Sequence, residues 1–411
     1  MRATPRRLLG PLLALGLVSA LAGCGKTGLT HTSGALSPLK LLPVAPQGAL
    51  SVSTKNTTRL GGADAPSDAA AVARAVYPGL TAASRPQAVV IVDTNNWGAS
   101  LAAAALASAP LRLPVLYSDG GTVPEVSLQA LAAMHPTGAS ALGGAQVIVI
   151  GSASAAPGGY RVRIATVPAG DPAAAAAAVE PLLAAARSAT PHQVLVVPAD
   201  SPQAVEMPAA GLAAESGAPV LFATAKGVPS ATSAVLSRLH RPAIYLLGFS
   251  SAAAGTLAEL QRLGPATAIT GASVIGEGLN PVGNAVAVAR YTDGSFGWGV
   301  KEPGHGLVFA NAARPLDAPA AALLSATGDY GPLLLLEDPA KVPPVLATYL
   351  SDIQPAYGTA PQYQPVRGAY NHGWLIGDER AIAAATQAEV DTMLEIVPGK
   401  ASAEESALTP E

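Results

Sequence analysis

Val-Val-Ile-Val at residues 89–92, followed by Asp-Thr-Asn-Asn-Trp at 93–97 and an alanine-rich run, decides the fold of this 411-residue chain. Four consecutive β-branched residues without polar alternation predict a strand covered on both faces, as in a parallel sheet. The alanine-rich run predicts a thin helix able to lie close to that sheet. Two later stretches repeat this order, and their apolar runs are Val-Leu-Val-Val at 194–197 and Leu-Val-Phe at 307–309.

The whole order of elements occurs three times. Each copy opens with a strand and a helix that has proline in its first turn, where the missing N–H would have no partner anyway. The apolar strand and the alanine-rich helix follow, then a strand led by proline, another helix and a strand that ends in glycine. The opening prolines are Pro66, Pro172 and Pro281, the leucines of the alanine-rich helices are Leu106, Leu212 and Leu323, the proline-led strands start at Pro114, Pro219 and Pro332, and the closing glycines are Gly151, Gly248 and Gly377.

Constant spacing supports the alignment of the three copies. The leucines are 106 and 111 residues apart, and the opening prolines are 106 and 109 apart. Each copy is therefore expected to be a β-α-β-α-β-α-β unit of about 100 residues, with right-handed crossovers and a small parallel sheet of its own. The predicted domains are 52–155, 160–258 and 262–397, the last with an insertion near 356–367.

Leu21-Ala22-Gly23-Cys24 closes a leader with a basic head and an apolar core of 13 residues, 8–20. Such a pattern predicts a lipoprotein signal peptide over 1–23, cut before Cys24, whose thiol then carries acyl chains such as palmitate. The alternative is an uncleaved signal anchor. Lipidation would place the protein at a cell membrane, on its extracytoplasmic side. Residues 24–51 are then a tether and 398–411 a disordered tail.

Composition excludes several classes of partner and site. Charged residues are only 12% of the chain and the net charge is −3, which argues against binding to nucleic acid. Cys24 is the only cysteine, so disulfides are ruled out. The six histidines are scattered without metal-ligand spacing, and no cofactor motif is complete. We therefore expect neither a metal nor a cofactor.

The copies contain a recurring set of short motifs. In the first copy these are Arg59-Leu60-x-Gly62-x-Asp64, Asn96-Trp97, Pro114-Val115-Leu116 and Val149-Ile150-Gly151. With their counterparts they resemble the cell-wall-binding repeat type 2 family over residues 52–397. In this alignment Arg163 matches Arg59, and Ala268 stands there in the third copy.

The resemblance implies three tandem flavodoxin-like or Rossmann-like modules of the α/β class, packed around a pseudo-threefold axis. It also implies a non-enzymatic protein that associates with cell-wall polymers such as anionic glycans. A solute-binding lipoprotein of a transport system is the alternative function, although that class has two lobes and a hinge rather than three equivalent units.

Candidate binding residues follow the carboxyl ends of the predicted strands, where ligands bind to open parallel sheets. The candidates are Asp93, Thr94, Asn95, Asn96, Trp97, Ser118, Asp119, Asp200, Ser201, Gln203, Glu206, Asn311, Arg314 and Asp317. Polar residues at these places also cap helices and form turns. Trp97 is either a sugar-stacking surface or a core residue.

An enzymatic site is not indicated. Gly98-Ala99-Ser100 resembles a nucleophile elbow, but Ala102 replaces the second glycine and Ser100 lies eight residues beyond Val92. Glu206 and Asp317 occupy the place of Ser100 in the other copies. The sequence therefore predicts no catalytic residues.

Overall fold

The computed structural model describes residues 50–398, except 169, 188–189, 250–252, 270–279, 329 and 358–369. The predicted signal peptide, Cys24, nearly all of the tether and the tail after Pro398 lie outside the described residues, as does most of the insertion. Leu50 and Ser51 of the predicted tether belong to a strand. In the described part, no helix is both long and apolar enough to cross a membrane.

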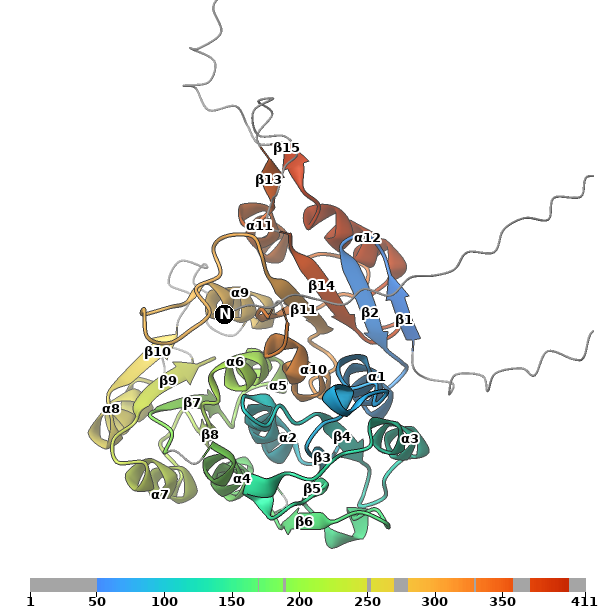
Figure 1. The fold of residues 1–411 in the computed structure, drawn as a ribbon. Helices are drawn as coiled ribbons and strands as arrows, with labels where there is room; N and C mark the ends of the chain where they lie inside the picture. The colour runs from blue at the N-terminus through green and yellow to red at the C-terminus, as the bar shows by residue number, and fades with distance from the viewer. Residues whose placement is uncertain are drawn as a thin grey trace, which may run out of the picture. The chain divides into compact units, whose positions relative to one another are not determined.

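Three parallel sheets form the α/β architecture that the repeats predict (Figure 1). The first has the order β4-β3-β5-β6, from Val115–Ser118, Val89–Asp93, Val147–Ile150 and Val162–Ala165. The second is β10-β9-β7-β8, from Ala266–Ile269, Ala243–Leu247, Gln193–Pro198 and Val220–Ala223.

The third sheet has the order β1-β2-β14-β11-β12. Its strands are Leu50–Ser53, Thr57–Gly61, His372–Ile376, Gly306–Asn311 and Leu333–Leu336, and β1 alone is antiparallel. A separate strand pair joins β13 (Ala356–Tyr357) to β15 (Val397–Pro398). We call the three sheets with their helices modules 1, 2 and 3.

The opening strand of each copy joins the sheet of the preceding copy, which corrects the expectation that each copy builds its own sheet. β6 of the second copy pairs with β5 of the first, and β10 of the third pairs with β9 of the second. Successive strands pair readily because the connection between them is short. In module 3, β2 from the first copy pairs with β14, at the place that the opening strand of the next copy takes in modules 1 and 2. The chain therefore closes on itself.

Pairing registers also correct the match between Arg59 and Arg163. Each closing strand ends with an aliphatic residue followed by glycine. The residue just before this aliphatic residue pairs with Arg59 in module 3, with Ile164 in module 1 and with Ala268 in module 2. Arg163 is thus one residue out of register. Since side chains alternate along a strand, it points to the other face of its sheet.

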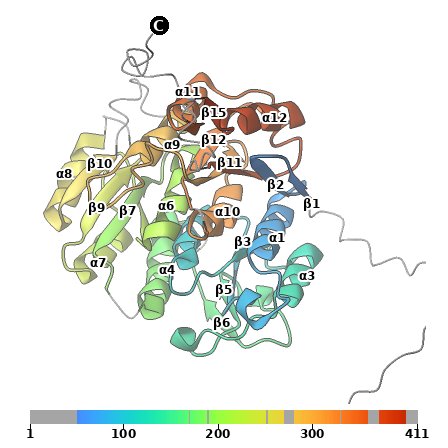
Figure 2. The same ribbon diagram turned by 45° about the horizontal axis from the view of Figure 1, so that its top comes forward.

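Three central helices pack against one another between the sheets, as the pseudo-threefold arrangement requires (Figures 1 and 2). They are α2 (Trp97–Ala103) with its 3-10 extension to Ala107, α6 (Pro208–Ser216) and α10 (Asp317–Ser325). Leu106, Leu212 and Leu323 are all buried. Small side chains allow the helices to approach closely, since a Cβ on Gly211 would lie 2.8 Å from Ser325 Oγ.

The remaining helices pack against the sheets, the central helices and one another. The opening helices are α1 (Ala65–Val76), α4 (Pro172–Arg187) and α9 (Pro281–Arg290), each with proline in its first turn as predicted. A second set follows the proline-led strands: α3 (Glu125–Met134), α7 (Ser230–Arg238) and α11 (Pro344–Asp352). The others are α5 (Gln203–Glu206), α8 (Ala254–Leu263) and α12 (Ala384–Met393).

Candidate functional site

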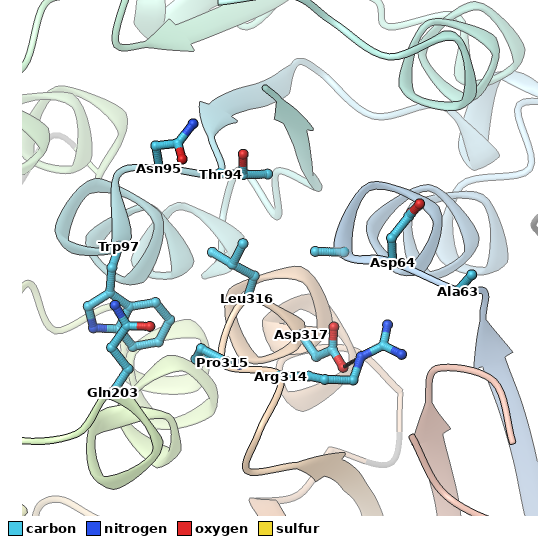
Figure 3. Close-up of a pocket in the computed structure, with 11 residues that line it drawn as sticks. Ala63, Asp64, Thr94, Asn95, Trp97, Gln203, Arg314, Pro315, Leu316 and Asp317 are labelled. Atoms are coloured by element: carbon cyan, nitrogen blue, oxygen red, sulfur yellow. Dashed lines mark ion pairs between the residues drawn. The ribbon is translucent and has the colours of Figure 1, made fainter. Parts of the chain in front are cut away.

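A pocket of about 400 Å³ lies where residues from all three copies meet (Figure 3). It is lined by the loops that follow β2, β3 and β11 and by the first residue of α5. It therefore occupies the carboxyl ends of parallel strands, where loops and helix N-termini present polar groups. The lining residues are Ala63, Asp64, Ala65, Thr94, Asn95, Trp97, Gln203, Arg314, Pro315, Leu316 and Asp317.

Arg314 forms the charged floor of the pocket. It pairs with Asp68 of α1, its Nε lies 3.0 Å from Asp317 Oδ2, and its Nη1 lies 3.8 Å from Asp378 Oδ1. Asp68 and Asp317 are fully buried, whereas Arg314 retains 19% of its side-chain exposure. The cluster joins copy 3 to the first helix of copy 1 and explains why a buried carboxylate is tolerated there.

Burial raises the pKa of Asp68 to about 6, although the positive charge of Arg314 opposes this shift. Burial, followed by the negative charge of Asp68, raises the pKa of Asp317 well above its usual range. The two carboxyls therefore hold a proton more readily than isolated carboxyls do, and Asp68 pairs with the guanidinium of Arg314. Arg314 is internally neutralised, so it offers little attraction to an anionic ligand.

Trp97 forms a second link between copies. Its side chain is 9% exposed, and its Nε1 donates to Glu206 Oε2 at 2.5 Å. Burial raises the pKa of Glu206 to about 8, although the hydrogen bond from Trp97 opposes this shift. Glu206 is therefore a neutral acid at pH 7. Trp97 is a core residue that also lines the pocket.

Ser100 occupies the position of Glu206 and Asp317 in the first copy. Its side chain is fully buried, and its Oγ has no hydrogen-bond partner among the described residues. A serine nucleophile needs access to substrate and a base within hydrogen-bond reach. Neither condition is met here. Nor do the described residues contain a group of three His, Cys, Asp or Glu side chains placed to hold a metal ion.

The predicted candidates that line the pocket are Thr94, Asn95, Trp97, Gln203, Arg314 and Asp317. Glu206 lies behind it, bonded to Trp97. Asn96 caps α2 by accepting from Ala99 N at 3.0 Å.

The other candidates lie in turns or in the sheets. Asp93 accepts from the backbone of Asn95 and Gly121, and Asp200 accepts from Ala225 N at 3.0 Å. Asn311 is buried and bonds to Ala381 O at 2.8 Å. Asp119 accepts from Thr94 at 3.3 Å, and Ser118 is buried in β4. These contacts correspond to the alternative interpretation of such residues as caps and turn formers.

Sequence reasoning missed Asp68 and the floor that it builds with Arg314. The only signal was an acidic side chain on the otherwise apolar face of the first helix. The structural role of Arg59 was missed as well. Arg59 is 3% exposed and donates to Gln387 Oε1 at 3.0 Å, to the carbonyls of Gly377 and Asp378 at 3.0 and 2.8 Å, and to Ile382 O at 2.6 Å. Its role is to fix β2 to module 3.

Comparison with known proteins identifies a fold. No family model and no curated protein matches the chain. Among solved structures, the chain is similar to Cwp6 from Clostridium difficile, with a TM-score of 0.61 and 17% identity over 84% of this chain and 51% of that one. It is also similar to Cwp8 from Clostridium difficile, with a TM-score of 0.59 and 15% identity over 83% and 53%. The chain thus spans about half the length of each.

Proposed function

We propose that this protein is a non-enzymatic, lipid-anchored component of the cell envelope that associates with a cell-wall polymer through the pocket between its three copies. The observation that carries the proposal is the position of this pocket, which exists only when all three copies are assembled. Support comes from the fold shared with Cwp6 and Cwp8 and from the leader that ends at Cys24.

The lining of the pocket favours a neutral, hydroxyl-rich group such as a sugar unit of the polymer. Thr94, Asn95 and Gln203 offer amide and hydroxyl groups that both donate and accept hydrogen bonds. Asp64 adds an acceptor at the rim. Because Arg314 is balanced by Asp68, the pocket has no free cation for a phosphate or carboxylate. Its volume lies within the range of pockets that hold small ligands.

Replacing Asn95 and Gln203 together by alanine is expected to weaken wall association about thirtyfold, since each side chain loses a hydrogen bond worth about 1 kcal/mol. Both side chains are exposed, so folding should be unaffected. Co-sedimentation of residues 45–411 with purified cell wall measures the effect. Gln129→Ala, an exposed glutamine on α3 away from the pocket, is the matched control.

Wall material stripped of its anionic polymer separates the possible ligands. Retention of the protein on stripped wall supports a neutral sugar in the pocket, whereas loss of retention points to the anionic polymer. Equal binding by the double variant and the wild type would refute the role of the pocket. A soluble sugar that raises the melting temperature, without any retention on wall, would instead favour the solute-binding alternative.

Cys24→Ser tests the lipid anchor. The wild type is expected to incorporate a labelled fatty acid and to sediment with membranes, because two or three acyl chains hold a protein there durably. The variant should carry no label and should keep its leader. Since Cys24 is the only thiol in the chain, residual labelling cannot come from another cysteine. Equal labelling of both proteins would exclude acylation at Cys24.

A further inference from the structure

Module 1 lacks a helix that modules 2 and 3 both have. In module 2, residues 248–265 connect β9 to β10 and contain α8, which packs beside α7 (Figure 1). In module 3, α12 follows β14 and packs beside α11. In module 1 the connection from β5 to β6 is residues 151–161, about two helical turns shorter, with only a 3-10 turn at Ala153–Ala155.

A groove of about 630 Å³ lies in module 1 at the place of the missing helix. Its apolar lining comes from the loop before α3, from α3 itself and from the short connection: Val123, Leu128, Leu131, Ala156, Pro157 and Tyr160. The positions correspond between modules because Val-Pro precedes α3, α7 and α11 alike, at 123–124, 228–229 and 342–343. No residue of the groove lines the central pocket.

The two covering helices share a five-residue pattern, Thr-x-Ala-Glu-aliphatic, at Thr256–Leu260 and Thr386–Val390. The threonine hydroxyl donates to a carbonyl of the loop before the neighbouring helix, Thr224 O at 2.8 Å in module 2 and Pro339 O at 2.7 Å in module 3. The aliphatic residues, Leu260 and Val390, are fully buried.

In module 2 the glutamate adds a hydrogen bond to this contact, since Glu259 accepts from Val228 N at 3.0 Å. In module 3, Glu389 lines one pocket with Val342 and Lys341. Val123 N and Val342 N, the donors equivalent to Val228 N, make no hydrogen bond within the part of the chain that the structure describes, so this bond is formed in module 2 alone. Module 1 therefore has the groove that such a helix would cover, but it lacks the helix itself.

We propose that the module 1 groove is a docking site for a helix of a partner protein that carries the pattern Thr-x-Ala-Glu-aliphatic. The partner helix lies along α3 as α8 lies along α7, with its aliphatic residue between Leu128 and Tyr160 and its glutamate on Val123 N. The occupant comes from outside the chain, because the pattern occurs only in α8 and α12 among all 411 residues. The proposal is independent of the polymer-binding function.

A stapled helical peptide with the sequence of residues 253–263 is the probe. Titrated into residues 45–411 and followed by fluorescence anisotropy, it is expected to bind saturably. Leu128→Asp places a charge in the apolar groove and should weaken binding about tenfold or more. Gln129→Asp adds the same charge at the neighbouring, exposed position of α3 and should leave binding unchanged. A peptide with Leu260→Asp should bind as weakly as the wild-type peptide binds to Leu128→Asp.

Two results would overturn the proposal. One is the absence of saturable binding to the wild type. The other is equal binding to the wild type and Leu128→Asp, which would show that the peptide binds elsewhere, for example by displacing α8 from module 2. Because Leu128 is only half-buried, melting curves of both aspartate variants should match that of the wild type, which separates loss of docking from loss of folding.

Discussion

Arg59→Met is expected to lower the free energy of unfolding by about 3 kcal/mol or more. Arg59 is buried and makes four hydrogen bonds to the segment that follows β14 and to α12. Methionine fills similar space but donates nothing, so the carbonyls of Gly377 and Ile382 lose a charged donor, and each buried acceptor left unpaired costs about 1–3 kcal/mol. Urea unfolding of residues 45–411 measures the loss.

The effect should be greatest where the chain closes. Arg59 lies on β2, the strand that joins the first copy to the sheet of module 3. Weakening this contact should release β1 and β2 before the rest unfolds, so we expect earlier proteolytic cleavage near residues 54–56, the turn between these strands.

Arg163→Met is the matched control. Arg163 is the arginine that sequence alignment pairs with Arg59, but it lies one residue out of register and is only half-buried, and its side chain makes no hydrogen bond within the described residues. Its replacement should change stability by no more than about 0.5 kcal/mol. Similar losses in both variants would mean that Arg59 does not fasten β2 to module 3.

The elements of the fold could be predicted because each leaves a local signal. Continuous β-branched runs marked β3, β7 and β11, and prolines marked the starts of α1, α4 and α9. Equal spacing of these signals then gave the number of modules. Such features depend on propensity and period, which a single sequence contains.

The exchange of opening strands could not be predicted in the same way. The composition of β2, β6 and β10 is that of parallel strands, whichever neighbour they join. Each strand joins the sheet that has an open edge beside its closing strand, and this is a property of the assembled fold. The floor of the pocket is a similar case. Asp68 and Arg314 are 246 residues apart, and only the closed ring of copies brings them together.

Replacing Glu206 by glutamine is expected to remove a large pH dependence of stability. Burial raises the pKa of Glu206 from its ordinary value of 4.5 to about 8 in the folded protein. The folded state therefore keeps this proton over a pH range in which the unfolded chain has released it. The stability from this group is fully present below pH 4.5, and it falls by about 1.4 kcal/mol per pH unit as pH rises toward 8.

Glutamine keeps the shape of the protonated acid, and its amide oxygen can accept from Trp97 Nε1 as Glu206 Oε2 does. It has no proton to lose, so Glu206→Gln should be close to the wild type in stability at pH 4.5 and more stable by about 3–5 kcal/mol above pH 8. Urea unfolding of both proteins between pH 4.5 and 9 gives the difference.

Asp68 and Asp317 have raised pKa values as well, and both are present in the two proteins, so their contribution cancels when the curves are subtracted. Glu125→Gln, at an exposed position at the start of α3, is the matched control for a change of glutamate to glutamine. If the stability of Glu206→Gln ran parallel to that of the wild type at every pH, Glu206 would be ionised in the folded state. The link between Trp97 and Glu206 would then be a charged hydrogen bond between two copies rather than a neutral one.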